Sequence, residues 1–214
     1  MQDAAAALPA RLLGDVAGKD VADLCAAPGG KTAQLAAAGG KVTAVDKSPG
    51  RLNRLKTNLA RLGLDAETFV ADAAEFAPGR MFDAILVDAP CTATGTIRRH
   101  PDILHLKRDE DIAALAVLQA RVLESAASAV KPGGRLVYCT CSLEPEEGAA
   151  QIAAFLAAHP QFKRVPVDRE ALGINPAWLS EDGDLRTLPS HAADLPDGFR
   201  GLDGFYAASL IRAA

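Results

Sequence analysis

The sequence predicts an α/β fold built on a mainly parallel, doubly wound sheet with helices on both faces. Short apolar segments alternate with longer helical segments along the chain, which is typical of such sheets. A turn containing Gly29 and Gly30 follows the first apolar segment. Asp46, Asp72 and Asp88 stand at or just beyond the ends of the next three apolar segments. Residues of these types in these places indicate a ligand site at the carboxyl edge of the sheet.

Local signals support the expected elements. Pro49 suits the first turn of a helix and Gly63 suits its end, so the second helix lies between them. The turn Pro132–Gly134 ends the longest helix, and Asp168–Asp203, rich in Pro, Gly and Asp, is expected to be mostly irregular. The expected strands are Val21–Cys25, Lys41–Val45, Glu67–Val70, Phe82–Val87, Arg135–Thr140 and Phe205–Ile211. The expected helices are Lys31–Ala38, Pro49–Leu62, Asp109–Val130 and Glu144–Ala158.

The composition is that of one globular domain. The chain has 214 residues, of which 49% are apolar and 23% charged, and this suits a single α/β domain over residues 1–214. The net charge of −4 argues against nucleic-acid binding through a generally basic surface. Binding of RNA would therefore require a local basic patch or a partner domain.

The four cysteines, Cys25, Cys91, Cys139 and Cys141, are expected to be free thiols. No CxxC pair or histidine cluster accompanies them, so no metal site is expected. The sequence shows neither a signal peptide nor an apolar run long enough to span a bilayer. We therefore expect a cytoplasmic protein with reduced thiols and no membrane association. Since no signature of oligomerisation is present, a monomer is the default expectation.

The segment Asp23–Thr32 (DLCAAPGGKT) has the composition of a ligand-binding turn. Its glycines let the backbone approach a ligand, and the helix that follows offers free N–H groups and a positive dipole end. Its last residues are similar to the end of a Walker A loop. That motif requires a glycine where Cys25 stands, which argues against a nucleoside triphosphatase. Two glycines alone are also compatible with a tight turn that binds nothing.

Two aspartates favour a ligand over an empty turn. Asp46 ends the second strand about twenty residues after the loop, where folds of this kind hold a ribose diol. Asp72, at the end of the third strand, is a candidate acceptor for an adenine amino group. Each aspartate alone would be interpreted as a turn or cap residue. Together with the loop, they predict an adenosyl-type cofactor.

Two cysteines lie beyond strands that are expected to be neighbours. Cys91 follows the fourth strand, and Cys141 ends the fifth. Because these strands are usually adjacent in a doubly wound sheet, both thiols should face one pocket. A cysteine is often merely a small buried apolar residue, and this interpretation is preferred for Cys25 and Cys139.

Two thiols beside an adenosyl-type methyl donor suit the methylation of cytosine. Carbon 5 of cytosine is a poor nucleophile, and addition of a thiolate to carbon 6 activates it toward a sulfonium methyl group. Asp88, when protonated or acting through a relay, is a candidate to hold the base at nitrogen 3, and the second thiol is a candidate helper in elimination of the first. The target base would have to be flipped out of its stack. Spacing alone leaves open whether Cys91 or Cys141 attacks.

A short basic cluster, Arg98, Arg99 and His100, follows the first of these cysteines, and Lys107–Arg108 lies further on. Such clusters are commonly no more than solvated surface. Here they flank the expected pocket, where the phosphates of a nucleic acid would run. The three residues Arg98 to His100 are therefore candidate RNA-binding residues.

Five motifs together resemble the Sun-type RNA (cytosine-5)-methyltransferases, in particular the RsmB-like bacterial enzymes of 16S ribosomal RNA. They are DLCAAPGGKT at Asp23–Thr32, AVD at Ala44–Asp46, DAPCTATGTIRRHPDI at Asp88–Ile103, YCTCSLEPEE at Tyr138–Glu147 and DGFY at Asp203–Tyr206. The resemblance covers nearly the whole chain. It implies a Rossmann-like class I methyltransferase fold that uses S-adenosylmethionine. It also implies methylation of carbon 5 of a cytosine in RNA, with 16S ribosomal RNA as substrate, through a covalent bond between cysteine and carbon 6.

The resemblance also assigns residues. It implies that Cys141 is the nucleophile and that Cys91 assists product release, whereas DNA cytosine methyltransferases attack with the thiol of their Pro-Cys pair. Asp88 is the third catalytic candidate. The implied cofactor-binding residues are Cys25, Ala26, Ala27, Pro28, Gly29, Gly30, Lys31, Asp46, Asp72 and Asp88. The family usually carries an N-terminal RNA-binding domain, and this chain begins just before the catalytic core, so residues 1–214 are expected to form the catalytic domain alone.

Three alternatives remain open at this point. Transfer RNA competes with ribosomal RNA as the substrate. A methyltransferase of proteins or small molecules would keep the cofactor loop and Asp46, but it would have no use for paired cysteines at strand ends. The third alternative is a non-catalytic RNA-binding module that retains the cofactor fold. The presence of Cys91, Cys141 and Asp88 argues against this alternative.

Overall fold

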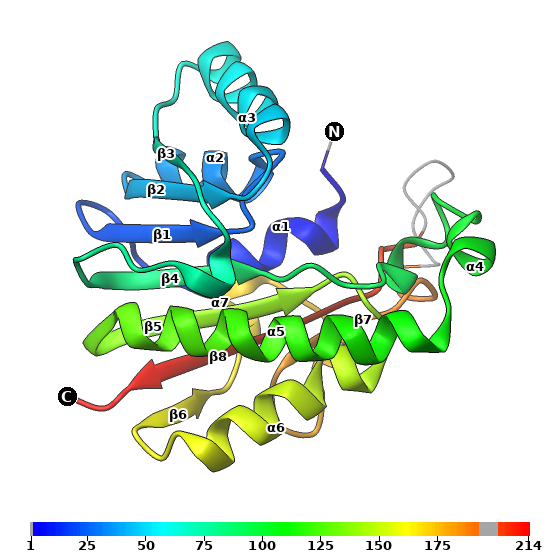
Figure 1. Cartoon of the computed structure of the whole chain (residues 1–214). Helices are drawn as coiled ribbons and strands as arrows, with labels where there is room; N and C mark the ends of the chain where they lie inside the picture. Colours follow the sequence, from blue (N-terminus) through cyan, green and yellow to red (C-terminus); the bar gives the residue numbers. More distant parts are fainter. Residues whose placement is uncertain (1, 193–200) are drawn as a thin grey trace.

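A single mixed sheet of eight strands organises the computed structural model, which describes residues 2–192 and 201–214 (Figure 1). The strand order is β3-β2-β1-β4-β5-β8-β6, and β7 pairs with β8 off this path. Strands β1 to β5 pair in parallel, whereas β8 is antiparallel to β5, β6 and β7. The strands are β1 Asp20–Leu24, β2 Lys41–Asp46, β3 Glu67–Val70, β4 Phe82–Asp88, β5 Val130–Thr140, β6 Phe162–Val165, β7 Leu185–Thr187 and β8 Phe205–Arg212.

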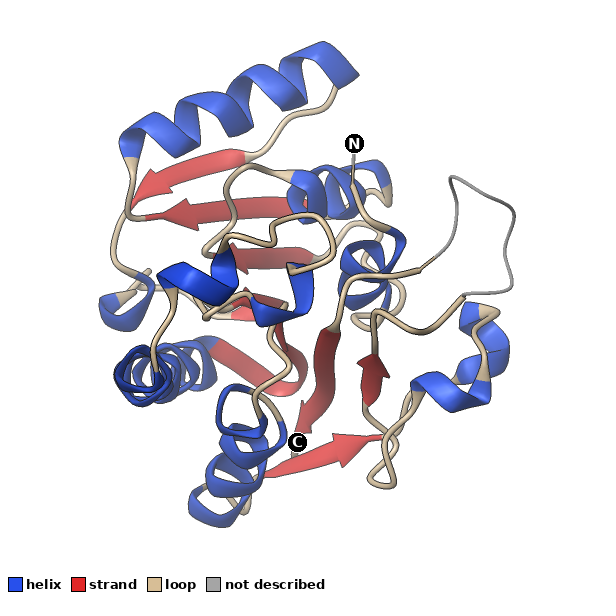
Figure 2. Cartoon of the chain, turned by 90° about the vertical axis from the view of Figure 1, so that its right-hand side faces the viewer, coloured by secondary structure: helices blue, strands red, loops and turns tan. Residues whose placement is uncertain are grey.

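Helices cover both faces of this sheet (Figure 2). The α-helices are α1 Ala4–Arg11, α2 Gly30–Ala37, α3 Pro49–Leu62, α4 Ile103–Leu106, α5 Asp109–Ala129, α6 Ala149–Ala158 and α7 Arg169–Leu172. The short 3-10 helices are η1 Ala73–Glu75, η2 Thr94–Thr96, η3 Pro145–Glu147 and η4 Pro176–Trp178. The predicted fold class, a doubly wound and mainly parallel α/β sheet, is confirmed.

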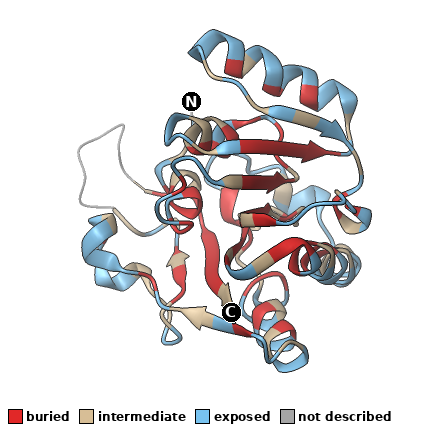
Figure 3. Cartoon of the chain, turned by 90° about the vertical axis from the view of Figure 1, so that its left-hand side faces the viewer, coloured by how far each residue is buried: buried red, intermediate tan, exposed pale blue. Residues whose placement is uncertain are grey.

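The core has one layer on each face of the sheet because successive side chains of a strand point in opposite directions. In β4, Ile85 packs in the layer beneath α5 and α6, whereas Leu86 packs in the layer beneath α1 and α2. In β5, Leu136 packs in the layer beneath α5 and α6, and Val137 packs in the layer beneath α1 and α2. The central strands are therefore buried on both faces, and exposed residues gather on the outer helices (Figure 3).

Most expected elements are present at the expected places. The helix Pro49–Leu62 and the strand Glu67–Val70 have the predicted bounds. The expected helix Glu144–Ala158 is instead divided into η3 and α6 at Gly148, whose backbone is not helical. A Cβ at this glycine would lie 3.1 Å from the ring of Tyr206, so the chain passes close to β8 at this point.

Several short elements were not predicted. Helix α1 contains Pro9, a residue that disfavours a helix interior, and β6 and β7 have only four and three residues. Strand β5 begins at Val130 rather than Arg135, and its register against β4 shifts at Ala84. The expected irregular segment contains α7, η4 and β7, and its residues 193–200 lie outside the described part of the chain.

Helix α5 corrects one expectation. By length and composition it is apolar enough to cross a membrane, whereas the sequence was expected to contain no such run. In the structure its Val122, Leu123 and Ala126 are buried in the core. The helix packs along β4 and β5, so its apolar side covers the sheet.

Candidate active site

The loop that follows β1 is shaped by two residues in left-handed conformation. Cys25 has a φ of 61° and Gly29 a φ of 99°. A Cβ at Gly29 would lie 2.7 Å from the side chain of Leu55 in α3, so only glycine fits. The loop is also tied to β2, because the Ala26 N–H donates to the carbonyl of Val45 at 3.0 Å. This packing holds the start of α2, with its free N–H groups, at the edge of the sheet.

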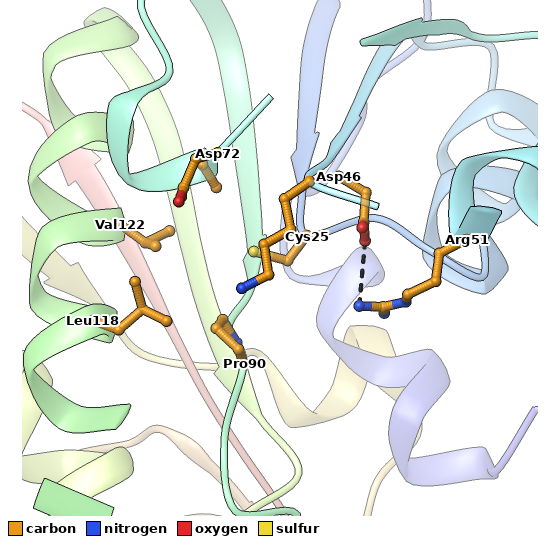
Figure 4. A pocket seen from close by; sticks show the side chains of 9 residues that line it. Cys25, Asp46, Arg51, Asp72, Pro90, Leu118 and Val122 are labelled. Atoms are coloured by element: carbon orange, nitrogen blue, oxygen red, sulfur yellow. Dashed lines mark ion pairs between the residues drawn. The ribbon is translucent and has the colours of Figure 1, made fainter. Parts of the chain in front are cut away.

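A pocket opens beside this loop at the ends of β1, β2 and β3 (Figure 4). It contains about 380 Å³ of empty space, counting the part open to solvent. Leu118 and Val122 of α5 form an apolar wall opposite Asp46 (Figure 4). The whole pocket is lined by Cys25, Asp46, Lys47, Arg51, Asp72, Ala73, Pro90, Leu118 and Val122. An apolar wall facing carboxylates suits a ligand with a flat apolar ring and several hydroxyl or amino groups.

The two pocket aspartates also hold the surrounding backbone. Asp46 is buried and accepts from the N–H groups of Ala27 at 3.2 Å and Ser48 at 2.9 Å. It also lies 3.6 Å from the guanidinium of Arg51. Asp72 caps η1 by accepting from the Ala74 N–H at 2.9 Å. Both residues therefore line the predicted ligand site and shape it at the same time.

Lys31 and Asp88 form an ion pair, with 2.8 Å between Nζ and Oδ2. The Lys31 side chain is only 8% exposed, lies 5.0 Å from the ring centre of Phe205, and reaches across from α2 to the end of β4. Burial lowers the pKa of Lys31, but the charge and hydrogen bond of Asp88, together with Cys139 and Asp23, raise it by more, so the pKa lies above its ordinary value. The thiol of Cys139 donates to the other carboxylate oxygen of Asp88 at 3.5 Å.

This pairing was not predicted. Sequence reasoning assigned Lys31 to the ligand loop and Asp88 to both the ligand site and the reaction, and the two residues are 57 positions apart. The close approach depends on which strands are neighbours, because β1, which precedes α2, lies next to β4.

The thiols of Cys91 and Cys141 are neighbours, with 3.6 Å between the two Sγ atoms. They come from the loops after β4 and β5, which are adjacent strands as expected. The hydrogen bond from the Cys91 thiol lowers the pKa of Cys141. The same contact raises the pKa of Cys91, and burial and the charge of Glu147 raise it further. The pair therefore favours a thiolate at Cys141 and a protonated thiol at Cys91.

The other two cysteines lie apart from this pair. Cys25 lines the ligand pocket, and burial raises its pKa to about 12, so its thiol stays protonated. Cys139 is fully buried on β5, where burial also raises its pKa. Neither environment favours a nucleophile.

Glu147 is a completely buried carboxylate that holds the Cys91 loop in place. It accepts from the backbone N–H of Thr92 at 2.9 and 3.1 Å and also from the Thr92 hydroxyl. The amide of Gln119 in α5 donates to Glu147 at 3.0 Å and to the carbonyl of Pro90 at 2.9 Å. Sequence reasoning missed this residue, because nothing in the run of acidic residues after Cys141 distinguishes a buried carboxylate from an exposed one.

Two glycines allow the loops of the two cysteines to pack together. The Gly95 N–H donates to the Cys141 carbonyl at 3.0 Å, and the Gly204 N–H donates to the Gly95 carbonyl at 2.7 Å. A Cβ at Gly95 would lie 1.9 Å from the carbonyl oxygen of Gly204, so a side chain there is impossible without moving the backbone. Thr94 adds a hydroxyl that accepts from the Leu143 N–H at 2.9 Å.

Asp23 is a further buried acid beside the site. Its Oδ2 accepts from the Thr32 hydroxyl at 2.6 Å, whereas its buried Oδ1 has no partner among the described residues. Burial raises its pKa to about 7. The charge of Asp88 raises this pKa further, and the charge of Lys31 opposes it.

The predicted RNA-binding cluster has partners inside the protein. Arg99 donates to both carboxylate oxygens of Asp203, a residue that is only 1% exposed, and Arg98 lies 3.0 Å from Asp3 and 3.4 Å from Asp203. His100 is 3.4 Å from the guanidinium of Arg99. Much of the basic charge of this cluster is therefore balanced locally. Within residues 2–192 and 201–214, no cluster of His, Cys, Asp or Glu side chains is arranged to hold a metal ion.

The sheet order, the glycine loop and the aspartates at successive strand ends define a class I methyltransferase fold. Residues 10–211 match the family model of the 16S rRNA methyltransferases RsmB/F. Ribosomal RNA small subunit methyltransferase B of Sodalis glossinidius is 43% identical over 217 residues, which cover 99% of this chain and 46% of that protein. The chain therefore belongs to the RsmB/F family, and it spans about half the length of the curated relatives it matches.

Two solved structures agree with this assignment. The crystal structure of PH0851 has a TM-score of 0.87 and 38% identity, covering 98% of this chain and 46% of that one. NSun6 from Pyrococcus horikoshii, solved with SFG, has a TM-score of 0.84 and 27% identity, covering 100% of this chain and 53% of that one.

Proposed function

We propose that the chain is the catalytic domain of an enzyme that transfers a methyl group from S-adenosylmethionine to carbon 5 of a cytosine in RNA, with 16S ribosomal RNA as substrate. The observation that carries the proposal is the pair of thiols, 3.6 Å apart, at the ends of β4 and β5. Asp88, the last residue of β4, forms the ion pair with Lys31 of α2, and Pro90, which directly precedes Cys91, lines the ligand pocket. Methylation of oxygen or nitrogen atoms has no use for such a pair of thiols.

The pocket residues fit S-adenosylmethionine, which supplies an electrophilic methyl group when it is bound. Asp46 would accept from the ribose hydroxyls, and Asp72 from the adenine amino group. Leu118 and Val122 would cover the adenine ring. The loop Cys25–Lys31 and the N-terminus of α2 would hold the methionine part, since backbone N–H groups and a helix dipole favour a carboxylate.

Cys141 is the proposed nucleophile. Its lowered pKa favours the thiolate, which forms a bond from Sγ to carbon 6 of the cytosine. The electron pair of the carbon 5–carbon 6 double bond then becomes available at carbon 5, which takes the methyl group. Asp88 would hold the ring at nitrogen 3 when it carries a proton, which the adjacent Lys31 ammonium can supply, and passing that proton to nitrogen 3 would offset the developing negative charge.

Cys91 is proposed to act in release. Once Cys141 is bonded to carbon 6, it is no longer a hydrogen-bond acceptor with negative charge, and two causes of the high pKa of Cys91 disappear. Cys91 can then lose its thiol proton to solvent and, as a thiolate, accept the proton from carbon 5. The electron pair of that C–H bond restores the double bond as the Sγ–carbon 6 bond breaks, and Cys141 leaves as a thiolate.

A methylation assay tests this function. The chain is incubated with S-adenosylmethionine and either unmodified 16S ribosomal RNA or transfer RNA, and the nucleosides are then analysed by mass spectrometry. We expect 5-methylcytidine in ribosomal RNA, and its loss by at least about a thousandfold in Cys141→Ala, since the reaction has no alternative nucleophile. Cys139→Ser, which keeps a donor to Asp88, is the matched control and should keep the activity.

Each rival function has a distinct result in the same assay. Methylation of transfer RNA alone would identify a different substrate, and a methylated base other than cytosine would contradict the chemistry. A chain that binds RNA but not S-adenosylmethionine in calorimetry would be a non-catalytic module.

A further inference from the structure

The most basic segment of the chain is not the predicted cluster but helix α3. From Lys47 to Leu64 there are five basic residues and no acidic residue, in a chain whose net charge is −4. Helix α3 itself carries four of them, Arg51, Arg54, Lys56 and Arg61. An acidic protein that concentrates positive charge on one helix has a local electrostatic footprint of the kind that polyanions recognise.

The three arginines of α3, together with Asn58, form a stripe along one side of the helix. Arg51, Arg54, Asn58 and Arg61 are spaced three, four and three residues apart, which places them on one face. The buried face is formed by Leu52, Leu55 and Leu59. In Figure 3 this helix, at the top of the molecule, is buried toward the sheet and exposed on its outer side. Lys56 lies on the opposite flank of the helix from the arginine stripe.

Contacts with the β1 loop orient the stripe toward the proposed active site. The guanidinium of Arg51 donates to the carbonyl of Ala27, and the amide of Asn58 donates to the carbonyl of Pro28 at 3.0 Å. Asn58 and Arg61 also line a groove of about 1550 Å³, counting the part open to solvent, which extends to Lys31 and Asp88. One continuous depression thus joins the basic helix to the place proposed for the target base.

The stripe retains unbalanced charge, in contrast to the cluster at Arg98 and Arg99. Among the described residues, no carboxylate lies within 4.0 Å of Arg54 or Arg61, and Arg51 alone approaches an acid, at 3.6 Å from Asp46. All three arginine side chains are exposed. Acidic residues three or four positions away on the same helix would balance such a row, and α3 contains none.

We propose that the stripe Arg51–Arg54–Asn58–Arg61 on α3 is an RNA-binding surface that holds the phosphate backbone next to the flipped cytosine. This inference rests on the proposed RNA-methylating function and locates the part of the domain that binds the nucleic acid. The stripe is about 15 Å long at the rise of an α-helix, enough to follow a short stretch of backbone. Guanidinium groups suit phosphates because they donate in a planar fork. The recognised chemistry is the phosphate backbone of single-stranded RNA, so the surface contributes affinity and not base selection.

The test compares two double variants with the same change in net charge. Arg54→Gln/Arg61→Gln removes two charges from the stripe, and Lys56→Gln/Lys163→Gln removes two exposed charges outside it, one on the opposite flank of α3 and one on β6. Filter binding of the 214-residue chain to unmodified 16S ribosomal RNA is measured between about 50 and 200 mM salt. The stripe variant is expected to bind RNA more weakly than the unmodified chain. Its slope of log K against log salt should be shallower by about 1.4, since each phosphate contact with a single strand contributes about 0.7. The control variant should keep the slope of the unmodified chain.

Separate readouts distinguish failure of the surface from failure of the function. Calorimetric binding of S-adenosylmethionine and thermal unfolding should be unchanged in both variants, which shows that the fold is intact. Equal salt slopes for the stripe variant and the unmodified chain would overturn the surface while leaving RNA methylation in place. Equal losses of RNA affinity and salt slope in both double variants would mean that only total charge matters, and would also overturn the proposed surface. If the unmodified chain binds no RNA and methylates none, the proposed function itself fails.

Discussion

The two site thiols differ because their surroundings differ, although both are cysteines at strand ends. The pKa of Cys91 is raised by its hydrogen bond to Cys141, by burial and by the charge of the buried Glu147 carboxylate. In the same pair, the hydrogen bond with Cys91 lowers the pKa of Cys141. Sequence spacing left the choice of nucleophile open, and the arrangement around the two sulfur atoms favours Cys141.

Replacement of Glu147 by glutamine should change the pH dependence of methylation. The variant keeps the size of the side chain and an acceptor for the Thr92 N–H, but it removes a negative charge from beside Cys91. The pKa of Cys91 should therefore fall, and the rate profile for product release should shift to lower pH. The measurement is the rate of multiple-turnover methylation across the pH range.

A second variant separates the effect of the Glu147 charge from the effect of the position of the Cys91 loop. Thr92→Val removes the hydroxyl hydrogen bond to Glu147 and leaves the carboxylate in place. It should lower the rate without moving the profile along the pH axis. Identical profiles for Glu147→Gln and the unmodified chain would show that the carboxylate acts only as a structural anchor.

The sequence identified residues whose type and position carry the signal, and it missed those whose role depends on a distant partner. The glycine loop, Asp46, Asp72 and the two thiols stand at strand ends and could be predicted. The Lys31–Asp88 pair and the Glu147–Thr92 contact join residues 57 and 55 positions apart. Their meeting depends on the register of adjacent strands, and no local pattern specifies this.

At the scale of elements, the site is assembled by close packing between loops. The loop after β4, the loop after β5 and the start of β8 meet at Gly95 and Gly204. The long parallel elements were predictable from their apolar patterns, and the antiparallel edge formed by β6, β7 and β8 was predicted only in part. Strands of three or four residues are too short for a pattern to be distinguished from a loop.

Gly95→Ala should disrupt this packing strongly. A methyl group would lie 1.9 Å from the Gly204 carbonyl oxygen, and no change of rotamer can relieve a clash with backbone. We expect a loss of at least about 2 kcal/mol in the free energy of unfolding, measured by urea denaturation. Gly50→Ala is the control, because nothing lies within 4 Å of its Cβ and it stands in α3. The control should be neutral or stabilising by up to about 1 kcal/mol, and equal losses in both variants would refute the packing argument.

At the scale of the whole molecule, the site contains a buried acid that should make stability depend on pH. The folded chain raises the pKa of Asp23 from 3.8 to about 7. Between these values the folded state therefore binds a proton that the unfolded state has lost, and the contribution to stability falls as pH rises through this window. The effect on the free energy of unfolding is at most about 4 kcal/mol, because a tenfold change in acidity corresponds to about 1.4 kcal/mol.

Asp23→Asn should remove this contribution. The amide can still accept from the Thr32 hydroxyl, but it does not ionise. Urea denaturation between about pH 4 and 8 should give a flatter dependence on pH for the variant than for the unmodified chain. Asp65→Asn changes an exposed acid and should leave the dependence unaltered. Parallel curves for Asp23→Asn and the unmodified chain would show that Asp23 titrates normally.

Covalent trapping on a denaturing gel distinguishes the roles of the two thiols directly. Cys91→Ser is incubated with S-adenosylmethionine and unmodified 16S ribosomal RNA, with Cys141→Ser and the double variant alongside. If Cys141 attacks carbon 6 and Cys91 is needed for release, Cys91→Ser gives a slower protein–RNA band that is absent from both other variants. A band that persists without Cys141, or that forms in Cys141→Ser instead, would contradict the assignment of the two thiols.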